Sequence, residues 1–549
     1  MGVPFFFRQI VEKYPNIVLD KIKKCNRLFL DFNAVIHTCS AIVVSKKPTD
    51  YTNLDIFNEI IKYTITVSNI CKQSDLLYLG VDGLAPRAKI QQQRRRRYLS
   101  AYRNTLINDF KKKNNLPLSS WDSNCITPGT NFMIELDLFL KNYFKENKFP
   151  FQVILSGHNE RDEGEHKIIH YIKNNKGEYT DVIIGLDADL IFLSLGCNNS
   201  NIYLMRESEE FGRNVTNNMS STTKQLFFKY VDINLLKKCI SQFLYGTDDI
   251  SYMYDFIGIM VLVGNDFIPS MSFLKLKNGA LDILCDVYKK IFNELNSIFD
   301  SENKQHIIEK RESDGKYIIN HTFFVKMLDL FAKSENNCMK EIIEHHSNIV
   351  YNPNRRFNTK LERFTYEYEN MPLINRFPDI INPHTDSNWR MNYYHHLFGS
   401  HSTDIMKSVT MNYLEGLLWT INYYFNDSCD NLWYYEYDYS PCVSDLYKYT
   451  YTIEAEKFKK MQLDLLKNKP NKNEIDSSIQ MLMVLPPQSI AIIPDKYKCL
   501  FTDINRGCVH YFPTQFKLST FLKTQTWECV PILPKVNLEV IREAMNKIQ

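Results

Sequence analysis

Seven acidic residues in the first half of the chain follow apolar runs, at spacings that could bring several of them together. They are Asp31, Asp82, Glu163, Glu165, Asp187, Asp189 and Asp266. Carboxylates gathered in one place repel each other unless cations compensate their charge. Mg²⁺ prefers carboxylate oxygens and water as ligands, and two such ions can activate water and stabilise the leaving oxygen of a phosphodiester. The pattern predicts a site for two divalent ions, with Mg²⁺ expected and Mn²⁺ as its substitute.

An acidic residue after a strand can also have a structural role, because its carboxylate can cap the following helix. For any single one of the seven acids, capping is the better interpretation. Capping does not explain Glu163-Gly164-Glu165 or Asp187-Ala188-Asp189. One helix needs one cap, and a second acid beside it adds repulsion. These paired acids favour the metal site.

A strongly basic segment follows Asp82. Residues 86–113 begin with proline, which suits the start of a helix, and contain a run of four arginines. One face of this helix would carry Lys89, Gln93, Arg96 and Arg97. Guanidinium groups bind phosphate oxygens through paired hydrogen bonds. A solvated charged helix or a nuclear localisation signal would explain the charge alone. Because the helix starts beside the acids, we expect a phosphate pocket next to the metal site.

Strand-like and helix-like segments alternate from residue 27 to residue 187. The expected strands are 27–31, 76–82, 151–156 and 181–187, and the expected helices are 54–72, 86–113, 131–145 and 165–173. This alternation predicts an α/β fold with a mostly parallel central sheet flanked by helices. Such sheets bind ligands at the carboxyl ends of their strands, where the acids would converge.

The second half of the chain gives weaker signals. We expect polar surface excursions over 196–224 and 300–318, a linker over 350–392, a helix over 402–426, a polar connector over 465–478, and irregular structure with short strands over 479–549, closed by a helix from Asn537. Two domains are predicted: one over 1–350 that carries the acids and the basic helix, and a mixed, partly helical region over 351–549 that packs over the site.

The composition is that of an ordinary globular protein. Of 549 residues, 44% are hydrophobic and 23% are charged, and the net charge is only +3. A nucleic-acid site must therefore be local. The Cys residues form no C-x-x-C pair, no signal peptide opens the chain, and no apolar run approaches the roughly 20 residues that span a bilayer. We expect a soluble monomer of the cytoplasm with no membrane contact, and the nucleus or a viral factory are the alternative compartments.

Ordered blocks of the sequence resemble the eukaryotic XRN-type 5′→3′ exoribonuclease family, densely over 1–290 and more weakly beyond. The blocks are Met1-Gly-Val-Pro, Leu28-Phe-Leu-Asp-Phe-Asn-Ala-Val-Ile-His37, 81–94, 122–130, Glu163-Gly-Glu-His-Lys167, 185–190, 262–269, Trp433-Tyr-Tyr, Leu485-Pro-Pro and Trp527-Glu528. Two places depart from the family pattern. Ala34 replaces the usual glycine, and Asn159-Glu-Arg-Asp162 replaces a Pro-Gly step.

The resemblance implies a PIN/FEN-like nuclease core and a role for each matching residue. The seven acids would hold the metal ions. A 5′ phosphate would be bound by Lys89, Gln93, Arg96 and Arg97. His37 and Trp433 would stack on the terminal bases, since stacking tolerates every base. For Trp433 a core position is an equally good interpretation, because tryptophan is usually largely buried.

These expectations combine into a processive, Mg²⁺-dependent 5′→3′ exoribonuclease. Its substrate would be single-stranded RNA with a 5′ monophosphate, its products nucleoside 5′-monophosphates, and its role RNA decay. The alternative is a structure-specific flap DNA nuclease, which also groups acids at the ends of parallel strands. A non-catalytic RNA-binding protein is less favoured because all seven acids are present.

Overall fold

The structure is a computed structural model. It describes residues 6–548 except 119–120, 186, 198–200, 208–227, 250–251, 298–303, 377–379 and 467–474. The Met1-Gly-Val-Pro block, most of the predicted excursion over 196–224 and much of the predicted connector over 465–478 lie outside the described residues. Among the described helices, none combines the length and the apolar character that crossing a membrane requires.

A seven-stranded sheet forms the centre of the first half, in the order β1-β7-β6-β5-β2-β3-β4. The strands are β1 Val18–Leu19, β2 Arg27–Asp31, β3 Leu76–Gly80, β4 Gln152–Ser156, β5 Thr180–Ile184, β6 Asn201–Glu207 and β7 Phe228–Asp232. From β6 to β4 all neighbours are parallel, whereas β7 runs antiparallel to both β6 and β1. The predicted α/β fold and its four strands are confirmed. Of the predicted excursion over 196–224, residues 201–207 instead form β6.

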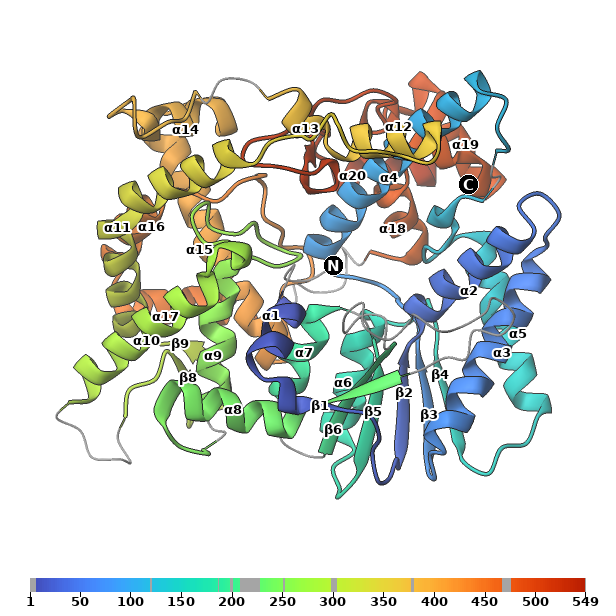
Figure 1. The fold of residues 1–549 in the computed structure, drawn as a ribbon, viewed down its shortest axis with the longest axis horizontal. Helices are drawn as coiled ribbons and strands as arrows, with labels where there is room; N and C mark the ends of the chain where they lie inside the picture. Colours follow the sequence, from blue (N-terminus) through green and yellow to red (C-terminus); the bar gives the residue numbers. More distant parts are fainter. Residues whose placement is uncertain are drawn as a thin grey trace.

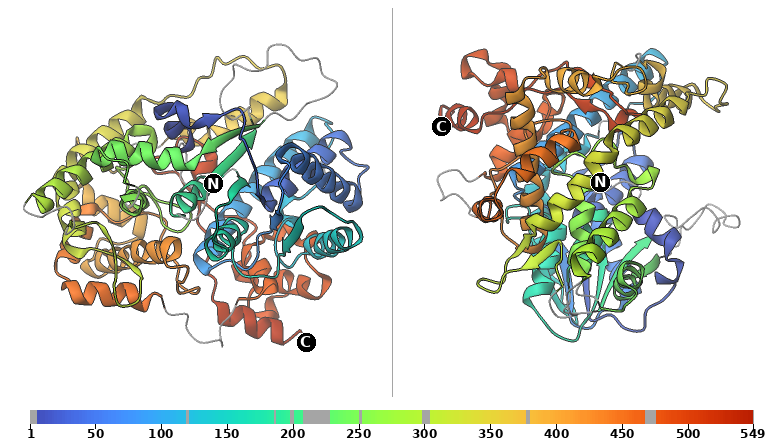
Figure 2. Two further views of the ribbon diagram at one scale, coloured as in Figure 1. Left: turned by 90° about the horizontal axis from the view of Figure 1, so that it is seen from below. Right: turned by 90° about the vertical axis from the view of Figure 1, so that its left-hand side faces the viewer.

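Helices cover both faces of this sheet (Figures 1 and 2). Leu28 and Leu30 of β2 join an apolar cluster with α2 Phe32–Lys46, α3 Asn53–Cys71 and α5 Asn131–Glu146. Phe29, which points to the opposite face, joins a second cluster with α6 Gly164–Asn174, α7 Ala188–Leu195 and α8 Ile233–Tyr245. Parallel strands are buried on both faces in this way.

The strand order reverses direction at β2. The chain adds β3 and β4 on one side of β2, and then crosses back to add β5 and β6 on the other. A parallel sheet opens a crevice at such a switch point, beyond the carboxyl ends of the two strands. The topology therefore places a crevice beyond β2 and β5, where the predicted acids follow their strands.

A mainly helical region packs beside the sheet (Figure 1). Its helices are α9 Met253–Met260, α10 Ala280–Asn296, α11 His321–Asn348, α14 Trp389–Phe398, α15 Thr403–Phe425, α16 Val443–Tyr451 and α17 Ala455–Asp464, with a hairpin of β8 Ile308–Lys310 and β9 Tyr317–Ile319. The hairpin occupies part of the predicted excursion over 300–318. One continuous apolar cluster includes Ile183 of the sheet, Phe323 and Leu446. The predicted boundary at residue 350 stays a prediction, because this core spans it.

The last part of the chain packs around helix α4 Arg87–Lys113. It contains α18 Ser477–Val484, α19 Asp495–Thr502, α20 Leu538–Asn546 and the strand pair β10 Leu518–Ser519 and β11 Val530–Pro531. The closing helix is confirmed, but irregular structure was the wrong prediction for α18 and α19. Six consecutive residues of α18, 479–484, are buried, so it lacks the one-sided apolar pattern that identifies a surface helix.

The predicted linker over 350–392 is also partly helical. Helix α12, Lys360–Glu369, begins with a capping box between Thr359 and Glu362, and α13 Met371–Ile374 follows. A threonine followed three residues later by glutamate is a helix-start signal that the composition of this segment obscured.

Candidate active site

The acids after the central strands meet at the carboxyl edge of the sheet. Asp31 is the last residue of β2, Asp82 lies just beyond β3, and Asp187 follows β5. Glu163 directly precedes α6, which contains Glu165, and Asp189 lies in the first turn of α7. Asp266 arrives differently, because its apolar run forms α9 and a short 3-10 turn rather than a strand.

A pocket of about 380 Å³ opens at this edge. The predicted acids in its walls are Asp31, Asp82, Glu163, Glu165 and Asp187. The predicted phosphate-binding and stacking residues in its walls are Lys89, Gln93, Arg96, Arg97 and His37. Five of the seven acids, which together we call the acidic cluster, therefore share one cavity with the basic face of α4, whereas Asp189 and Asp266 are not among its lining residues.

Gly164 allows the two glutamates to stand this close to the strands. A Cβ at this position would lie 2.4 Å from the carbonyl oxygen of Gly80 and 3.1 Å from Oδ1 of Asp31. The start of α6 thus packs directly on the backbone of β3. This contact explains why a glycine separates Glu163 from Glu165 in the sequence.

The helix-cap alternative applies to only one of the strand-end acids. Asp31, Glu163 and Asp187 occupy cap positions of α2, α6 and α7, but none makes a side-chain capping hydrogen bond. Oδ1 of Asp82 accepts a hydrogen bond of 2.9 Å from the backbone N–H of Gly164 at the start of α6. Helix capping therefore does not explain Asp31, Glu163 or Asp187.

The side chain of Lys89 inserts among the acids. Its Nζ lies 2.9 Å from Oε1 of Glu163 and 2.7 Å from Oδ2 of Asp266. Burial alone would lower the pKa of Lys89, but Asp266 and Glu163 raise it well above its usual value. At Asp266 burial raises the pKa of the carboxyl, but Lys89 together with other positive groups such as Arg96 lowers it below its usual value. Lys89 is therefore a charged member of the acidic cluster as well as a wall of the pocket.

One ammonium leaves the cluster with excess negative charge. Burial, followed by the neighbouring acids, raises the pKa of Asp31 and of Glu165 well above the usual carboxyl range. Burial raises the pKa of Glu163 and of Asp189 to about 7. Four carboxyls that resist ionisation indicate that the site lacks positive charge.

The donor chemistry of this cluster fits hard divalent cations. Oε2 of Glu165 is buried and has no hydrogen-bond partner among the described residues. Carboxylates in excess of their partners are the ligands that Mg²⁺ and Mn²⁺ favour. Within the described ranges, no three Asp, Glu, His or Cys side chains are already arranged as a set that could hold an ion. Members of the acidic cluster instead contact Lys89, Tyr423 and Tyr424.

The basic face of α4 has unused hydrogen-bonding capacity in the pocket. The guanidinium of Arg97 donates to Oδ1 of Asn124 (3.4 Å) and to the carbonyl of Ile126 (3.2 Å). Nε of Arg97 and Oε1 of Gln93 are buried without a hydrogen-bond partner in the described part of the chain. Burial and the neighbouring Arg96 lower the pKa of Arg97 to about 10, so it remains charged at neutral pH. The guanidinium charge and the unpartnered donor Nε of Arg97 suit an anion, whereas Oε1 of Gln93 is an acceptor and does not contribute to this preference.

The two predicted stacking residues have different surroundings. His37 lines the pocket, where burial and the nearby Arg97 and Arg96 lower its pKa to about 4, so its ring is neutral. Trp433 is only 9% exposed and stacks on Trp419, with the ring centres 5.3 Å apart. It is not among the residues that line the acidic pocket. The structure places Trp433 in the core, and its stacking on a base stays a prediction.

Several site residues were not predicted from the sequence. Asn33 donates to Oδ2 of Asp82 (2.8 Å) and accepts from the N–H of Asp82 (3.1 Å), so it fixes that carboxylate. Its place two residues after Asp31 was the available signal. From the helical region, the hydroxyl groups of Tyr423 and Tyr424 in α15 donate to Glu163 (3.5 Å) and Asp189 (3.3 Å). Nothing local in the sequence marks these tyrosines.

Comparisons with known proteins cover nearly the whole chain. Residues 1–208 match the XRN 5′-3′ exonuclease N-terminus, and residues 248–367 and 301–549, which overlap, match the Xrn1 helical domain. A relative from Schizosaccharomyces pombe named 5′-3′ exoribonuclease 1 is 27% identical over 98% of this chain and 48% of its own length. The human 5′-3′ exoribonuclease 1 is 28% identical over all of this chain and 34% of its own length.

A third relative, 5′-3′ exoribonuclease 2 of Arabidopsis thaliana, is 24% identical over all of this chain and 67% of its own length. The chain thus spans about half or less of the length of the first two relatives. The first match covers strands β1 to β6 of the sheet that supports the acids, and the second covers the helical region from α9 onward. The chain belongs to the XRN 5′→3′ exonuclease family.

Proposed function

We propose that this protein is a 5′→3′ exoribonuclease that degrades single-stranded RNA in RNA decay. The observation that carries the proposal is the single cavity shared by the acidic cluster and the cationic face of α4. The names of the relatives support the same activity. The finer proposal is a substrate with a 5′ monophosphate, stepwise release of nucleoside 5′-monophosphates, and processive action.

The proposed cofactor is Mg²⁺, with two ions bound and Mn²⁺ as a substitute. Its ligands would come from Asp31, Asp82, Glu163, Glu165, Asp187, Asp189 and Asp266. When bound, the ions would activate water and stabilise charge on the oxygens of the scissile phosphate. Support comes from the raised pKa values of Asp31, Glu163, Glu165 and Asp189, which show a deficit of positive charge.

The chain's own residues would select and orient the RNA end. Gln93, Arg96 and Arg97 would bind the 5′ monophosphate, and Lys89 would bridge this group to the acids. Held there, the terminal nucleotide would present the next phosphodiester to the carboxylates, and such positioning contributes to rate as well as to affinity. The neutral ring of His37 would stack on a base near the end. A cap or triphosphate would fit poorly because of its bulk and charge.

The proposed activity is tested with end-labelled RNA of defined 5′ chemistry, with and without Mg²⁺. Stepwise release of mononucleotides from 5′-phosphorylated RNA, dependent on Mg²⁺ and slower by at least about 100-fold on 5′-hydroxyl RNA, is expected. Equal rates on both ends would contradict the role of α4. A flapped DNA duplex in the same assay distinguishes the alternative nuclease, because preferential cleavage at the flap junction would replace the RNA proposal.

A variant of one acid tests the metal assignment. Asp187→Asn keeps the shape of the side chain but removes its charge, so turnover should fall by about 10³-fold or more while RNA binding is largely kept. Wild-type turnover in this variant would exclude Asp187 as a ligand. The matched control is Asp122→Asn, a residue that caps a short turn near the pocket through the N–H of Asn124. Its turnover should change little.

We further propose that the protein acts in the cytoplasm as a monomer. In support of the cytoplasm, two residues of the four-arginine run have contacts within the fold, since Arg94 is buried and Arg95 pairs with Asp438. A fluorescent fusion that accumulates in the nucleus would contradict the compartment. Sedimentation that gives a mass of two chains would contradict the monomer.

A further inference from the structure

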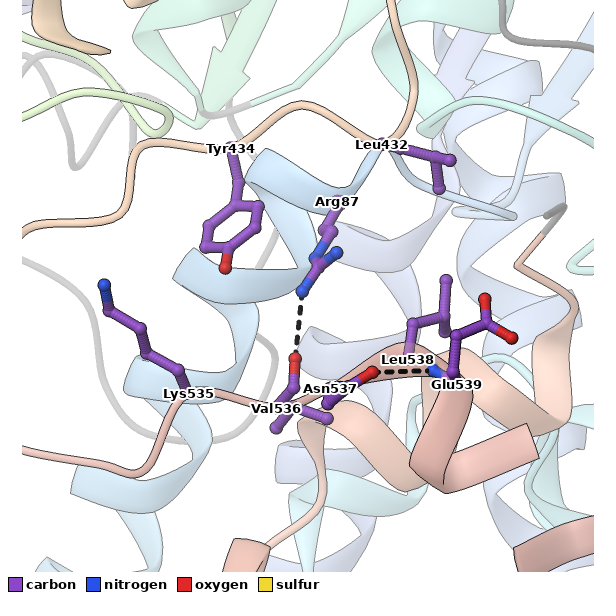
Figure 3. A pocket seen from close by; sticks show the side chains of 8 residues that line it. All are labelled: Arg87, Leu432, Tyr434, Lys535, Val536, Asn537, Leu538 and Glu539. Atoms are coloured by element: carbon purple, nitrogen blue, oxygen red, sulfur yellow. Dashed lines mark hydrogen bonds between the residues drawn. The ribbon is translucent and has the colours of Figure 1, made fainter. Parts of the chain in front are cut away.

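A second pocket, of about 360 Å³, lies at the start of α4 (Figure 3). Arg87 enters it from the first turn of α4, Leu432 and Tyr434 enter from the segment after α15, and residues 535–539 enter from the segment that leads into α20 and its first residues. None of these residues lines the acidic pocket. The backbone N–H of Arg87 donates to the carbonyl of Asn431 (2.9 Å), which ties two of the three walls together.

A guanidinium stacked on an aromatic ring forms one side of this pocket. The central carbon of the Arg87 guanidinium lies 4.1 Å from the centre of the Tyr434 ring. Nη2 of Arg87 donates to the carbonyl of Val536 (2.9 Å), as Figure 3 shows. Nε of Arg87 is buried and has no hydrogen-bond partner among the described residues. A buried donor without a partner is costly, and a bound acceptor would remove that cost.

A second cation stands at the rim. Lys535 is exposed, pairs with Glu436 at 2.9 Å, and has its Nζ 5.2 Å from the centre of the Tyr437 ring. Exposed ion pairs of this kind are weak, so Lys535 can exchange its partner for another anion. The lining residues contain two cations and one carboxylate, that of Glu539. Glu436, the partner of Lys535, adds a second carboxylate at the rim, so positive charge becomes available only when Lys535 exchanges Glu436 for a ligand. One phosphate fits this limited charge better than a polyphosphate does.

The remaining walls are apolar. Leu432, Val536 and Leu538 complete the pocket beside the Tyr434 ring. Aromatic and aliphatic surface beside cations suits a ligand that has a flat ring and an anionic group. We propose that this pocket binds a nucleotide, with its base against Tyr434 and the apolar wall and its phosphate beside Arg87 and Lys535. The proposal rests on the proposed function, since RNA and the released mononucleotides supply such ligands.

The nucleotide has two sources, a residue of the RNA chain or a free mononucleotide. Calorimetric titration of the full chain with adenosine 5′-monophosphate tests the site directly. The variants Lys535→Ala and Tyr434→Leu should each weaken binding of adenosine 5′-monophosphate by about 5- to 10-fold. Each variant is made both in the wild-type chain and in a chain that also carries Arg97→Ala, so that binding in the acidic pocket does not mask the result.

The chain offers a matched control. Lys496 is also exposed, and its Nζ lies 4.7 Å from the ring centre of Tyr497, but it lies outside this pocket. Lys496→Ala should bind adenosine 5′-monophosphate as the wild type does. If Tyr434→Leu fails to fold, Lys535→Glu at the exposed position decides the question, and its loss should exceed that of Lys535→Ala.

A second titration identifies the source of the nucleotide. It uses 5′-phosphorylated oligonucleotides of increasing length and a chain that carries Asp187→Asn. Weaker binding of the longer oligonucleotides by Lys535→Ala assigns the pocket to the RNA strand. Unchanged oligonucleotide binding with weaker binding of the mononucleotide assigns it to a free nucleotide. Mononucleotide and oligonucleotide binding both equal to the control would overturn the proposal, and so would a polyglutamate peptide that binds there in place of the nucleotide.

These titrations need no turnover, so the two proposals fail separately. A chain that degrades no RNA but loses nucleotide affinity in Lys535→Ala refutes the exonuclease and keeps this site. A chain that degrades RNA but binds nucleotide equally in all variants refutes this site and keeps the exonuclease.

Discussion

Two sides of helix α4 carry the same residue types in opposite surroundings. On one side, Arg96 and Arg97 line the acidic pocket beside Lys89. On the other side, Arg94 is only 2% exposed and donates to the carbonyls of Met483 (3.1 Å) and Tyr511 (2.5 Å). The first side borders a cavity, and the second holds the C-terminal helices against the sheet domain.

The difference shows that residue type and charge do not decide what an arginine does in this helix. Arg94 satisfies main-chain carbonyls, which are permanent partners, and its guanidinium also lies 4.9 Å from the ring centre of Tyr98. Arg97 contacts Asn124 and Ile126 but keeps a buried Nε without a partner in the described structure. Pocket-side arginines should therefore matter for substrate, and docked arginines for stability.

The largest expected effect is on the pocket side. Arg97→Ala removes a cation and a planar donor from the proposed phosphate site, so kcat/KM on 5′-phosphorylated RNA should fall by about 100-fold. The rate on 5′-hydroxyl RNA should change much less, and the melting temperature should stay within about 2 °C. Arg103→Ala is the control, since Arg103 lies on the same helix outside the acidic pocket and its ion pair of 3.7 Å with Glu369 is exposed. An equal loss of kcat/KM on 5′-phosphorylated and 5′-hydroxyl RNA would show that Arg97 acts on the structure of the protein rather than on the 5′ phosphate.

The docked side should show the reverse pattern. Arg94→Met keeps the apolar stem but leaves the carbonyls of Met483 and Tyr511 without their donors, so the free energy of unfolding should fall by about 2–4 kcal/mol. Urea denaturation measures this loss, and kcat/KM of the folded protein should remain within about twofold. If Arg94→Met kept its stability and lost its activity, the division between the two sides would be wrong.

Local sequence predicted most of the sheet domain, and its limits have physical causes. Strand-end acids and the periodicity of α4 depend on nearby residues only, so Asp31, Asp82 and Asp187 could be placed at one edge from the alternation of strands and helices. The same periodicity assigned Lys89, Gln93, Arg96 and Arg97 to one face of α4, and the structure confirms that this face lines the cavity.

The residues that the second half of the chain contributes to the active site could not be predicted from local sequence. Tyr423 and Tyr424 reach the acids because α15 packs against the sheet domain, and these contacts join residues 260 and 235 positions apart. The pairing of Lys89 with Glu163 and Asp266 likewise depends on long-range packing. Arg94 is chemically identical to Arg97, and only the docking of the C-terminal helices distinguishes them.

A smaller effect is expected at α6. Like α4, this helix has one residue in the active site and another that contacts a distant segment of the chain. Glu165 faces the acidic cluster, whereas Nε2 of His170 lies 3.2 Å from Oδ1 of Asp427 and Nδ1 lies 3.5 Å from Oδ2 of Asp162. Against the effect of burial, these two acids raise the pKa of His170 from 6.5 to about 9. His166 packs near this ring, and Lys173 also pairs with Asp427.

Because the folded-state pKa is raised, protonated His170 stabilises the fold fully below pH 6.5. That stability is lost as the pH rises from 6.5 to about 9. Solvent screening limits the loss to about 1 kcal/mol. Urea midpoints measured across this range should fall in the wild type and fall less in His170→Gln. Parallel pH profiles of the two proteins would exclude His170 as a charged docking contact.

The smallest effect is expected at the boundary between the two sides of α4. Arg95 is about one-third exposed and lies 2.5 Å from Oδ1 of Asp438. Such a partly exposed pair contributes little, so Arg95→Ala should lower the free energy of unfolding by at most about 1 kcal/mol and leave kcat/KM within about twofold. A double-mutant cycle with Asp438→Ala measures the pair alone. If the coupling free energy between Arg95 and Asp438 were as large as the effect of Arg94→Met, Arg95 would belong with the arginines that stabilise the fold. If Arg95→Ala strongly lowered kcat/KM, Arg95 would belong with the arginines that bind substrate.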